Sequence, residues 1–80
     1  MKASRKNLEK IILEIVKEAL GYEKVKVNSS FLKLGGDSLK SMKVISKIKQ
    51  ELKVDLTFKD FFSCKTLNNL ITKVENKLID

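Results

Sequence analysis

Hydrophobic residues recur at helical spacing near the beginning of the chain. Between residues 4 and 20 one face is apolar, and the charged residues fall on the opposite face. Gly21 follows directly and is placed to end a helix in the left-handed conformation that glycine adopts easily. The pattern predicts a first helix over residues 4–20 that buries Leu8, Ile11, Ile12, Ile15, Val16, Ala19 and Leu20.

A second amphipathic stretch covers about residues 38–51. Leu39 lies almost opposite its apolar stripe, and Met42 lies on the flank of the stripe nearest Ser38. Isolated exposed apolar side chains are common, but these two are neighbours of Ser38, and methionine adapts to varied partners. We therefore expect a docking surface here, opposite a buried stripe of Ser41, Val44, Ile45, Ile48 and Leu52.

Two further helices are predicted after a short extended piece at residues 54–56. Thr57 and Asp60 have the spacing of a capping box, which predicts a short third helix through residue 63. This turn holds Phe58, Phe61 and Phe62, and we expect most of these rings to be buried. Thr66 is placed to cap a final helix, whose inward stripe is Leu67, Leu70, Ile71, Val74 and Leu78.

The connection over residues 22–37 is long for so small a domain. Its apolar alternation is too short and isolated for a sheet, and a loop of this length usually carries function. We expect it to pack over the helices and to deliver the Gly-Gly-Asp-Ser turn. The fold class is therefore all-α: a small four-helix bundle with a long first loop and a short third helix.

Composition indicates one globular domain over residues 1–80. The chain has 80 residues, of which 42% are hydrophobic and 34% charged. No stretch approaches the roughly 20 apolar residues that cross a bilayer, and Glu14 and Glu18 interrupt the apolar run that a signal peptide would need. One cysteine, Cys64, and no histidine argue against an internal disulfide, a metal site or an activated thiol. We expect a cytoplasmic protein in which Cys64 is a packing residue.

The net charge of +7 raises the question of a nucleic-acid or membrane partner. The basic residues are lysines except Arg5, whereas phosphate and base recognition favours arginine. They are also spread along the whole chain. We therefore interpret the charge as a solvated surface that could still select acidic proteins, in particular along Lys40, Lys43 and Lys47, and expect neither nucleic acid nor membrane as a partner.

The turn before the second helix presents a hydroxyl group. Gly35 and Gly36 free the backbone, Asp37 can cap the helix, and Ser38 begins it. A hydroxyl at this position lies at the positive end of the helix dipole. A phosphoester attached to it would be stabilised by the dipole and by free N–H groups. The turn is therefore a candidate attachment point for an anionic group.

Catalytic interpretations of the same residues fail on mechanism. Residues 36–39 also spell the GDSL motif of a hydrolase family, but its nucleophilic serine requires a base, normally histidine, which this chain lacks. A phosphate-binding P-loop would need Gly-Lys-Ser/Thr after the glycines. We therefore predict that the chain is not an enzyme.

The residues at this turn resemble a known family. The stretch Phe-Leu-Lys-Leu-Gly-Gly-Asp-Ser-Leu at 31–39, followed by Met42, resembles the attachment site of carrier proteins that bear 4′-phosphopantetheine. The Gly-Gly pair is more similar to the peptidyl carrier (thiolation) domains of nonribosomal peptide synthetases than to fatty-acid acyl carriers. Residues 54–56, 60–62 and 66–67 also agree with the family's later helices. The chain departs from the family at Lys33 and Lys65, and in its strongly basic surface.

This resemblance implies a function and a set of site residues. A phosphopantetheinyl transferase, using coenzyme A and Mg²⁺, would attach the arm to Ser38, with Asp37 aiding recognition and Gly35 and Gly36 shaping the turn. The arm's thiol would hold an aminoacyl, peptidyl or related acyl group as a thioester. The monomeric carrier would present it to adenylating, condensing and releasing (thioesterase-type) enzymes through a docking patch of Leu39, Met42 and Lys43. The alternatives are a polyketide or other acyl carrier and, from another class, a small basic helical module that binds nucleic acid.

Overall fold

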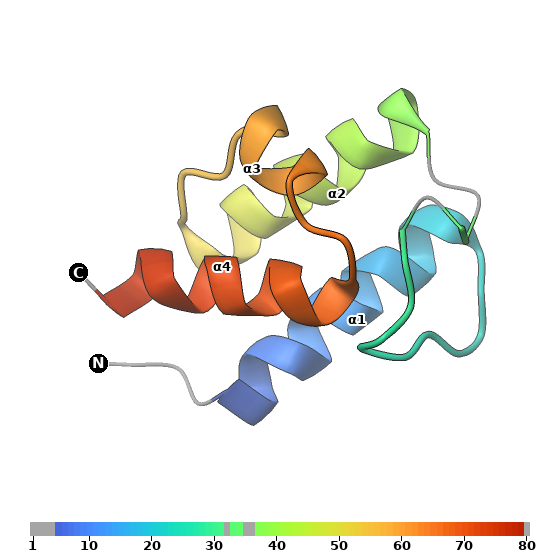
Figure 1. The fold of residues 1–80 in the computed structure, drawn as a ribbon, viewed down its shortest axis with the longest axis horizontal. Coiled ribbons are helices and arrows are strands. Elements are labelled where there is room, and N and C mark those ends of the chain that lie inside the picture. Colours follow the sequence, from blue (N-terminus) through green and yellow to red (C-terminus); the bar gives the residue numbers. More distant parts are fainter. Residues whose placement is uncertain (1–4, 32, 35–36, 80) are drawn as a thin grey trace.

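The computed structural model describes residues 5–31, 33–34 and 37–79, and four α-helices lie within these ranges (Figure 1). They are α1 (Arg5–Leu20), α2 (Ser38–Leu52), α3 (Phe58–Phe62) and α4 (Leu67–Ile79). Helix α1 packs against both α2 and α4, and α3 packs against α2. No strand occurs in the described ranges. The predicted all-α fold, with its long first loop and short third helix, is confirmed.

The core is formed by the apolar stripes that the sequence predicts. Ser41 and its apolar partners on α2 are buried except Leu52, which is partly buried. On α1 the buried face is wider than predicted, because Leu13 also packs against the core. Each of the three longer helices thus buries one face, and the fully or nearly fully buried residues of α1, α2 and α4 are Leu8, Ile12, Ile15, Val16, Ser41, Val44, Ile45, Ile48, Leu67, Leu70, Ile71 and Val74.

The expectation that most of the α3 phenylalanines are buried is wrong. Phe61 is 4% exposed and packs edge-on against Phe31, whereas Phe58 and Phe62 are 41% and 45% exposed. The two exposed rings stack with their centroids 5.5 Å apart. Residues 58 and 62 are four apart and share one face of the helix, so a five-residue helix that buries Phe61 must turn both outward.

The long connection is fixed to the beginning of α4, as Figure 1 shows where the teal segment returns toward the start of that helix. The backbone N–H groups of Leu67 and Asn68 donate to the carbonyl groups of Ser29 and Val27, at 2.9 and 2.7 Å. The Thr66 hydroxyl accepts from the N–H of residue 69 at 3.3 Å, which confirms its predicted capping role. The loop therefore supplies acceptors for the free N–H groups of α4. Its packing over the helices is confirmed for most apolar residues, although Tyr22 is 45% exposed.

Side chains also join α4 to the other helices. The Arg5 guanidinium on α1 donates to Asn68 Oδ1 at 2.7 Å, to Thr72 Oγ1 at 2.8 Å and to Glu75 Oε1 at 3.0 Å. Lys77 on α4 forms an ion pair with Asp60 of α3 at 3.1 Å. The single arginine is thus a contact between the first and last helices.

Helices α1 and α2 are each followed by a residue with a left-handed backbone, but the two residues are of different types. Gly21 has φ +76°, which confirms the predicted left-handed cap of α1. Lys53, at the end of α2, also has a positive φ of 57°, although no glycine marks this position. Its N–H donates to the Lys49 carbonyl, so the left-handed turn is still hydrogen-bonded.

Candidate functional site

Asp37 fixes the beginning of α2. Its backbone is extended, and its Oδ1 accepts a hydrogen bond from the N–H of Lys40 at 2.9 Å, so the predicted N-cap is confirmed. Its carbonyl oxygen accepts twice from Ser41, at 2.8 Å from the N–H and at 2.7 Å from the hydroxyl. The residue that precedes Ser38 is therefore held through both its side chain and its carbonyl group.

The two serines of this first turn have opposite environments. Ser41 is completely buried, and its hydroxyl is used in the bond to Asp37. Ser38 is exposed, and no hydrogen bond joins its side chain to another described residue. The apolar periodicity predicts Ser41 on the core stripe but does not reveal its bond to Asp37; the available signal is that a serine hydroxyl commonly bonds the carbonyl four residues earlier. Of the two, Ser38 has the hydroxyl that another protein can reach.

The charge around Ser38 suits an anionic substituent. Ser38 is the first residue of a 15-residue helix, where the helix dipole is positive, and the first turn contains no acidic residue. Lys40 is partly exposed and Lys43 is exposed within the next turn. A phosphodiester on the Ser38 oxygen would therefore lie in a favourable field.

Gly35 and Gly36, predicted to shape the turn, lie outside the described residues, as does Leu32. The described site therefore consists of Asp37, Ser38 and the helix that follows them.

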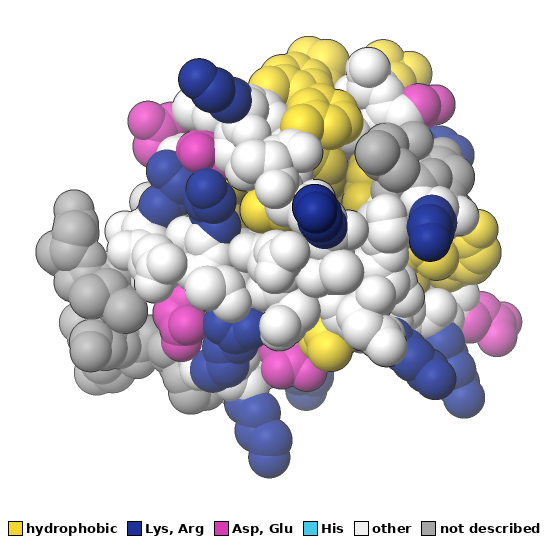
Figure 2. All heavy atoms as spheres, viewed as in Figure 1, with side chains coloured by type: hydrophobic (Ala, Val, Ile, Leu, Met, Phe, Trp, Pro, Cys, Tyr) yellow, Lys and Arg dark blue, Asp and Glu magenta, His cyan; other side chains and the backbone are white. Residues whose placement is uncertain are grey.

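Next to Ser38 the surface is apolar with basic residues beside it. Leu39 is 70% exposed, Met42 is 53% exposed, and Lys43 is exposed. All three line a groove between α2 and the second half of α1, which Ile15 and Ala19 also line. Figure 2 shows further hydrophobic side chains gathered over α3 and the neighbouring part of α2. The predicted exposure of Leu39 and Met42 is confirmed, and their role in docking stays a prediction.

Cys64 is a potentially nucleophilic side chain that lies outside this site. Its thiol is partly buried and contacts the Asp60 carbonyl oxygen at 3.3 Å. Burial raises the pKa of the Cys64 thiol, which opposes formation of the reactive thiolate. Cys64 packs against the core, in agreement with its predicted role. In the described ranges, no three side chains form a group suited to hold a metal ion.

A short helical bundle that presents an exposed serine at the start of its second helix is the architecture of a carrier domain, and family comparison supports this class. Residues 10–74 match the family described as "Phosphopantetheine attachment site", and the chain belongs to that family. Its members carry 4′-phosphopantetheine as a covalent cofactor. Within the family, the chain groups with the peptidyl carrier domains of nonribosomal peptide synthetases.

Three relatives support the assignment to peptidyl carrier domains. The chain is 41% identical over 68 residues to nonribosomal peptide synthetase agiA of Aspergillus flavus and 36% identical over 72 residues to surfactin synthase subunit 3 of Bacillus subtilis. It is 33% identical over 75 residues to bacitracin synthase 2 of Bacillus licheniformis. These matches cover 85%, 90% and 94% of this chain, but only 1%, 6% and 3% of the respective relatives. The chain therefore corresponds to a small part of each of these proteins.

The fold agrees with a solved carrier structure. BlmI, a type-II acyl carrier protein from Streptomyces verticillus involved in bleomycin biosynthesis, is 26% identical and superimposes with a TM-score of 0.88. The match covers 92% of this chain and 89% of that one. Across the described part of the chain, none of the helices has the length and apolar character to span a bilayer.

Proposed function

We propose that this chain carries aminoacyl, peptidyl or related acyl groups as thioesters on a 4′-phosphopantetheine arm attached to Ser38. The observation that carries the proposal is the exposed Ser38 hydroxyl at the positive end of α2, on a turn held by Asp37. The neighbouring hydroxyl of Ser41 is buried and hydrogen-bonded. Among the described serines of this turn, Ser38 alone is therefore suited to modification.

The attachment step joins the serine oxygen to phosphorus. The Ser38 Oγ loses its proton to a base of the transferase and forms a bond to the phosphorus of the pantetheine phosphate in coenzyme A. The bond from that phosphorus to the bridging oxygen breaks, and adenosine 3′,5′-bisphosphate leaves. On this chain, the α2 dipole stabilises the negative charge of the resulting phosphodiester. The bound arm supplies the thiol on which acyl groups are carried.

The proposed partners are separate enzymes or domains. They comprise a phosphopantetheinyl transferase and the adenylating, condensing and releasing components of a peptide synthetase. We propose Leu39, Met42 and Lys43 as the surface that they contact, because these residues are exposed beside Ser38. Residues 1–80 act as one carrier domain and contribute the attachment point, while the chemistry belongs to the partners.

Mass spectrometry after incubation with coenzyme A, Mg²⁺ and a transferase of broad specificity tests the attachment. We expect the wild-type chain to gain one phosphopantetheine mass and Ser38→Ala to gain none. Ser46→Ala is the matched control, since Ser46 is exposed on the same helix. Modification of Ser38→Ala, or loss of modification in Ser46→Ala, would contradict the assignment.

The cargo class can be tested on the same loaded protein. An acyl carrier of another pathway would bear the same arm, and the solved neighbour BlmI is described as a type-II acyl carrier protein. Incubation with a panel of adenylating enzymes, followed by mass measurement, separates the two possibilities. We expect aminoacyl groups to be transferred, because the relatives of higher identity are peptide synthetases.

A further inference from the structure

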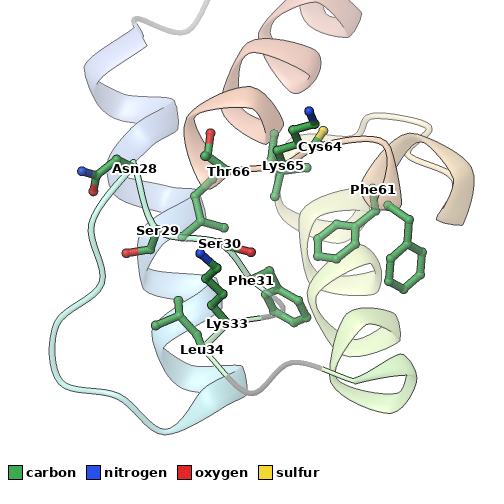
Figure 3. A pocket seen from close by; sticks show the side chains of 13 residues that line it. Asn28, Ser29, Ser30, Phe31, Lys33, Leu34, Phe61, Cys64, Lys65 and Thr66 are labelled. Atoms are coloured by element: carbon green, nitrogen blue, oxygen red, sulfur yellow. The ribbon is translucent and has the colours of Figure 1, made fainter.

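One aromatic ring anchors the long connection in the core. Of the described residues between α1 and α2, Phe31 alone is buried, at 7% exposure. Its ring meets that of Phe61 edge to face, with the centroids 5.0 Å apart and an angle of 84° between the planes. Figure 3 shows the two side chains, one from the connection and one from α3. The ring pair therefore fixes the connection against α3, in addition to the hydrogen bonds that join it to α4.

The partner ring connects this anchor to the helix that carries the attachment serine. Phe61 is the single buried residue of α3. Helix α3 packs against α2, whose first residue is Ser38. The contact between Phe31 and Phe61 therefore places the connection relative to a helix that itself lies on α2.

The anchor also lies close to Ser38 along the chain. Phe31 is the last buried residue before Ser38 among the described residues of the connection. The N–H of Leu34 donates to the carbonyl groups of Ser30 and Phe31 at 3.1 and 3.2 Å, so the backbone folds back directly after the ring. Asp37, which caps α2, is the next fixed point. Loss of the Phe31 anchor would therefore increase the number of backbone conformations open to the chain that leads into Ser38.

The edge-to-face arrangement gives this anchor a preferred orientation. Two aromatic rings favour it because the positive edge of one ring then faces the negative surface of the other. A leucine at either position would keep the apolar burial, but it has no ring edge or face with which to set the angle of its partner. Substitution by leucine therefore separates the aromatic contact from burial alone.

We propose that Phe31 and Phe61 are positioning residues for the modification of Ser38: their contact holds the connection so that the transferase meets Ser38 in a conformation that it can bind. The inference rests on the proposed attachment at Ser38. When only a fraction of the molecules has the conformation that a partner binds, the apparent affinity falls in proportion to that fraction. Loss of the ring contact should therefore raise KM for the carrier. It should leave kcat close to the wild-type value, because the transferase itself holds the serine once it is bound.

Leucine variants of the two rings test this inference. Phe31→Leu, Phe61→Leu and the double variant are compared with the wild type by steady-state kinetics of phosphopantetheine transfer, at a temperature at which all of them are folded. Val74→Ala is the control for lost stability alone, because it removes buried apolar atoms on α4 about 10 Å along the helix from Leu67, where α4 meets the connection. Urea denaturation ranks the stabilities. If Phe61→Leu does not fold, Phe61→Met takes its place, since methionine fills irregular core spaces.

We expect KM for the carrier to rise about two- to tenfold in each single leucine variant, the range that the loss of one edge-to-face contact gives. The double variant should show little further increase, because both substitutions remove the same contact. Val74→Ala should keep the wild-type KM even if its stability is equally low.

Amide exchange measured by NMR gives a second result that needs no transferase. The Lys40 N–H donates to Asp37 Oδ1 at the beginning of α2, whereas Ile48 lies in the buried middle of the same helix. We expect the ratio of the Lys40 exchange rate to the Ile48 exchange rate to rise in the leucine variants and to stay unchanged in Val74→Ala.

Three results would overturn the inference. They are a wild-type KM in a folded leucine variant, an equal rise in KM in Val74→Ala, and an exchange ratio that the leucine substitutions do not change. A failure of the attachment itself is distinguishable, because the wild-type mass would then stay that of the unmodified chain. The exchange ratio would still decide whether the ring pair holds the beginning of α2.

Discussion

Ser38 and Ser41 lie within one turn of α2, and solvent reaches only one of their hydroxyl groups. Ser41 is completely buried, and its hydroxyl donates to the Asp37 carbonyl oxygen at 2.7 Å. Ser38 precedes the first hydrogen-bonded residues of the helix and faces outward. The buried serine thus anchors the residue that presents the exposed one.

Ser41→Ala separates this anchoring role from the attachment role. The Asp37 carbonyl would still accept from the N–H of residue 41, so only one hydrogen bond is lost. We expect unfolding to require about 1 kcal/mol less free energy, measured by urea denaturation. Modification with phosphopantetheine should persist. A folded Ser41→Ala protein that cannot be modified, beside a Ser38→Ala protein that can, would reverse the two assignments.

At the scale of helices, α4 is held by contacts from α1, from α3 and from the long connection. Arg5 joins it to α1, Lys77 joins it to α3, and the Ser29 and Val27 carbonyls cap its first turn. Arg5 contributes through the planar shape of its guanidinium group, which reaches Asn68, Thr72 and Glu75 together.

Arg5→Lys tests whether this shape matters. Lysine keeps the charge, but its compact ammonium cannot donate to all three groups in the same directions. We expect Arg5→Lys and Arg5→Ala each to lower the free energy of unfolding, by up to about 1 kcal/mol for the alanine variant. Denaturation is measured at low and high salt. If Arg5→Lys had wild-type stability at both salt concentrations, the positive charge alone would account for the contribution of Arg5 to stability.

The ion pair between α3 and α4 predicts a pH dependence of stability. The hydrogen bond from Lys77, followed by that from the Thr57 N–H, lowers the pKa of Asp60 below its ordinary value. A carboxylate with a lowered folded pKa stabilises the fold above its unfolded pKa, and this contribution disappears as the pH falls through the folded pKa. We expect Asp60→Asn to be less stable than the wild type at pH 7. The difference should close on acidification through the range below the ordinary aspartate pKa.

Thermal unfolding of both proteins from pH 7 down to pH 2, a range that extends well below the ordinary aspartate pKa, measures this difference. Asparagine can still accept from the Thr57 N–H, so the capping box is retained and the comparison isolates the charge. Lys77→Gln should show the same convergence. A gap that stayed constant with pH would mean that the ion pair does not contribute.

Local patterns predicted the helices of this protein better than they predicted its contacts between segments. The 3.6-residue period identified the stripes of α1, α2 and α4, and the Thr57–Asp60 spacing identified α3. Both are properties of neighbouring residues. The bonds from Leu67 and Asn68 to the loop carbonyls join residues about forty apart, and they involve backbone groups that every sequence has. The exposure of Phe58 and Phe62 depended on which side of a short helix faces α2.

The candidate site was predicted for a similar reason. Asp37 and Ser38 form a cap and a helix start within two residues, so their local sequence determines their geometry. The left-handed backbone of Lys53 had no such signal, because the residue type that favours this conformation is glycine.

At the scale of the whole molecule, the basic residues that give the net charge of +7 differ in what they contact. Arg5 is engaged with α4 and so is not available as a free side chain for nucleic-acid bases. The exposed Lys43 and Lys47 instead line the groove between α1 and α2 that begins beside Ser38, together with Leu39 and Met42. An enzyme that approaches Ser38 therefore meets positive charge beside apolar side chains, which is complementary to an acidic surface.

This arrangement predicts that the reaction with a partner enzyme depends more on where a charged residue lies than on the net charge of the chain. Lys43→Glu and Lys10→Glu change the net charge equally, but Lys10 is exposed on α1 and does not line that groove. For a partner with an acidic docking surface, we expect Lys43→Glu to lower kcat/KM for modification or acyl transfer by about three- to tenfold at low salt, because a rim charge steers association. Lys10→Glu should change it little. Equal losses in the two variants would assign the effect to net charge, and a gain with Lys43→Glu would indicate a basic partner surface.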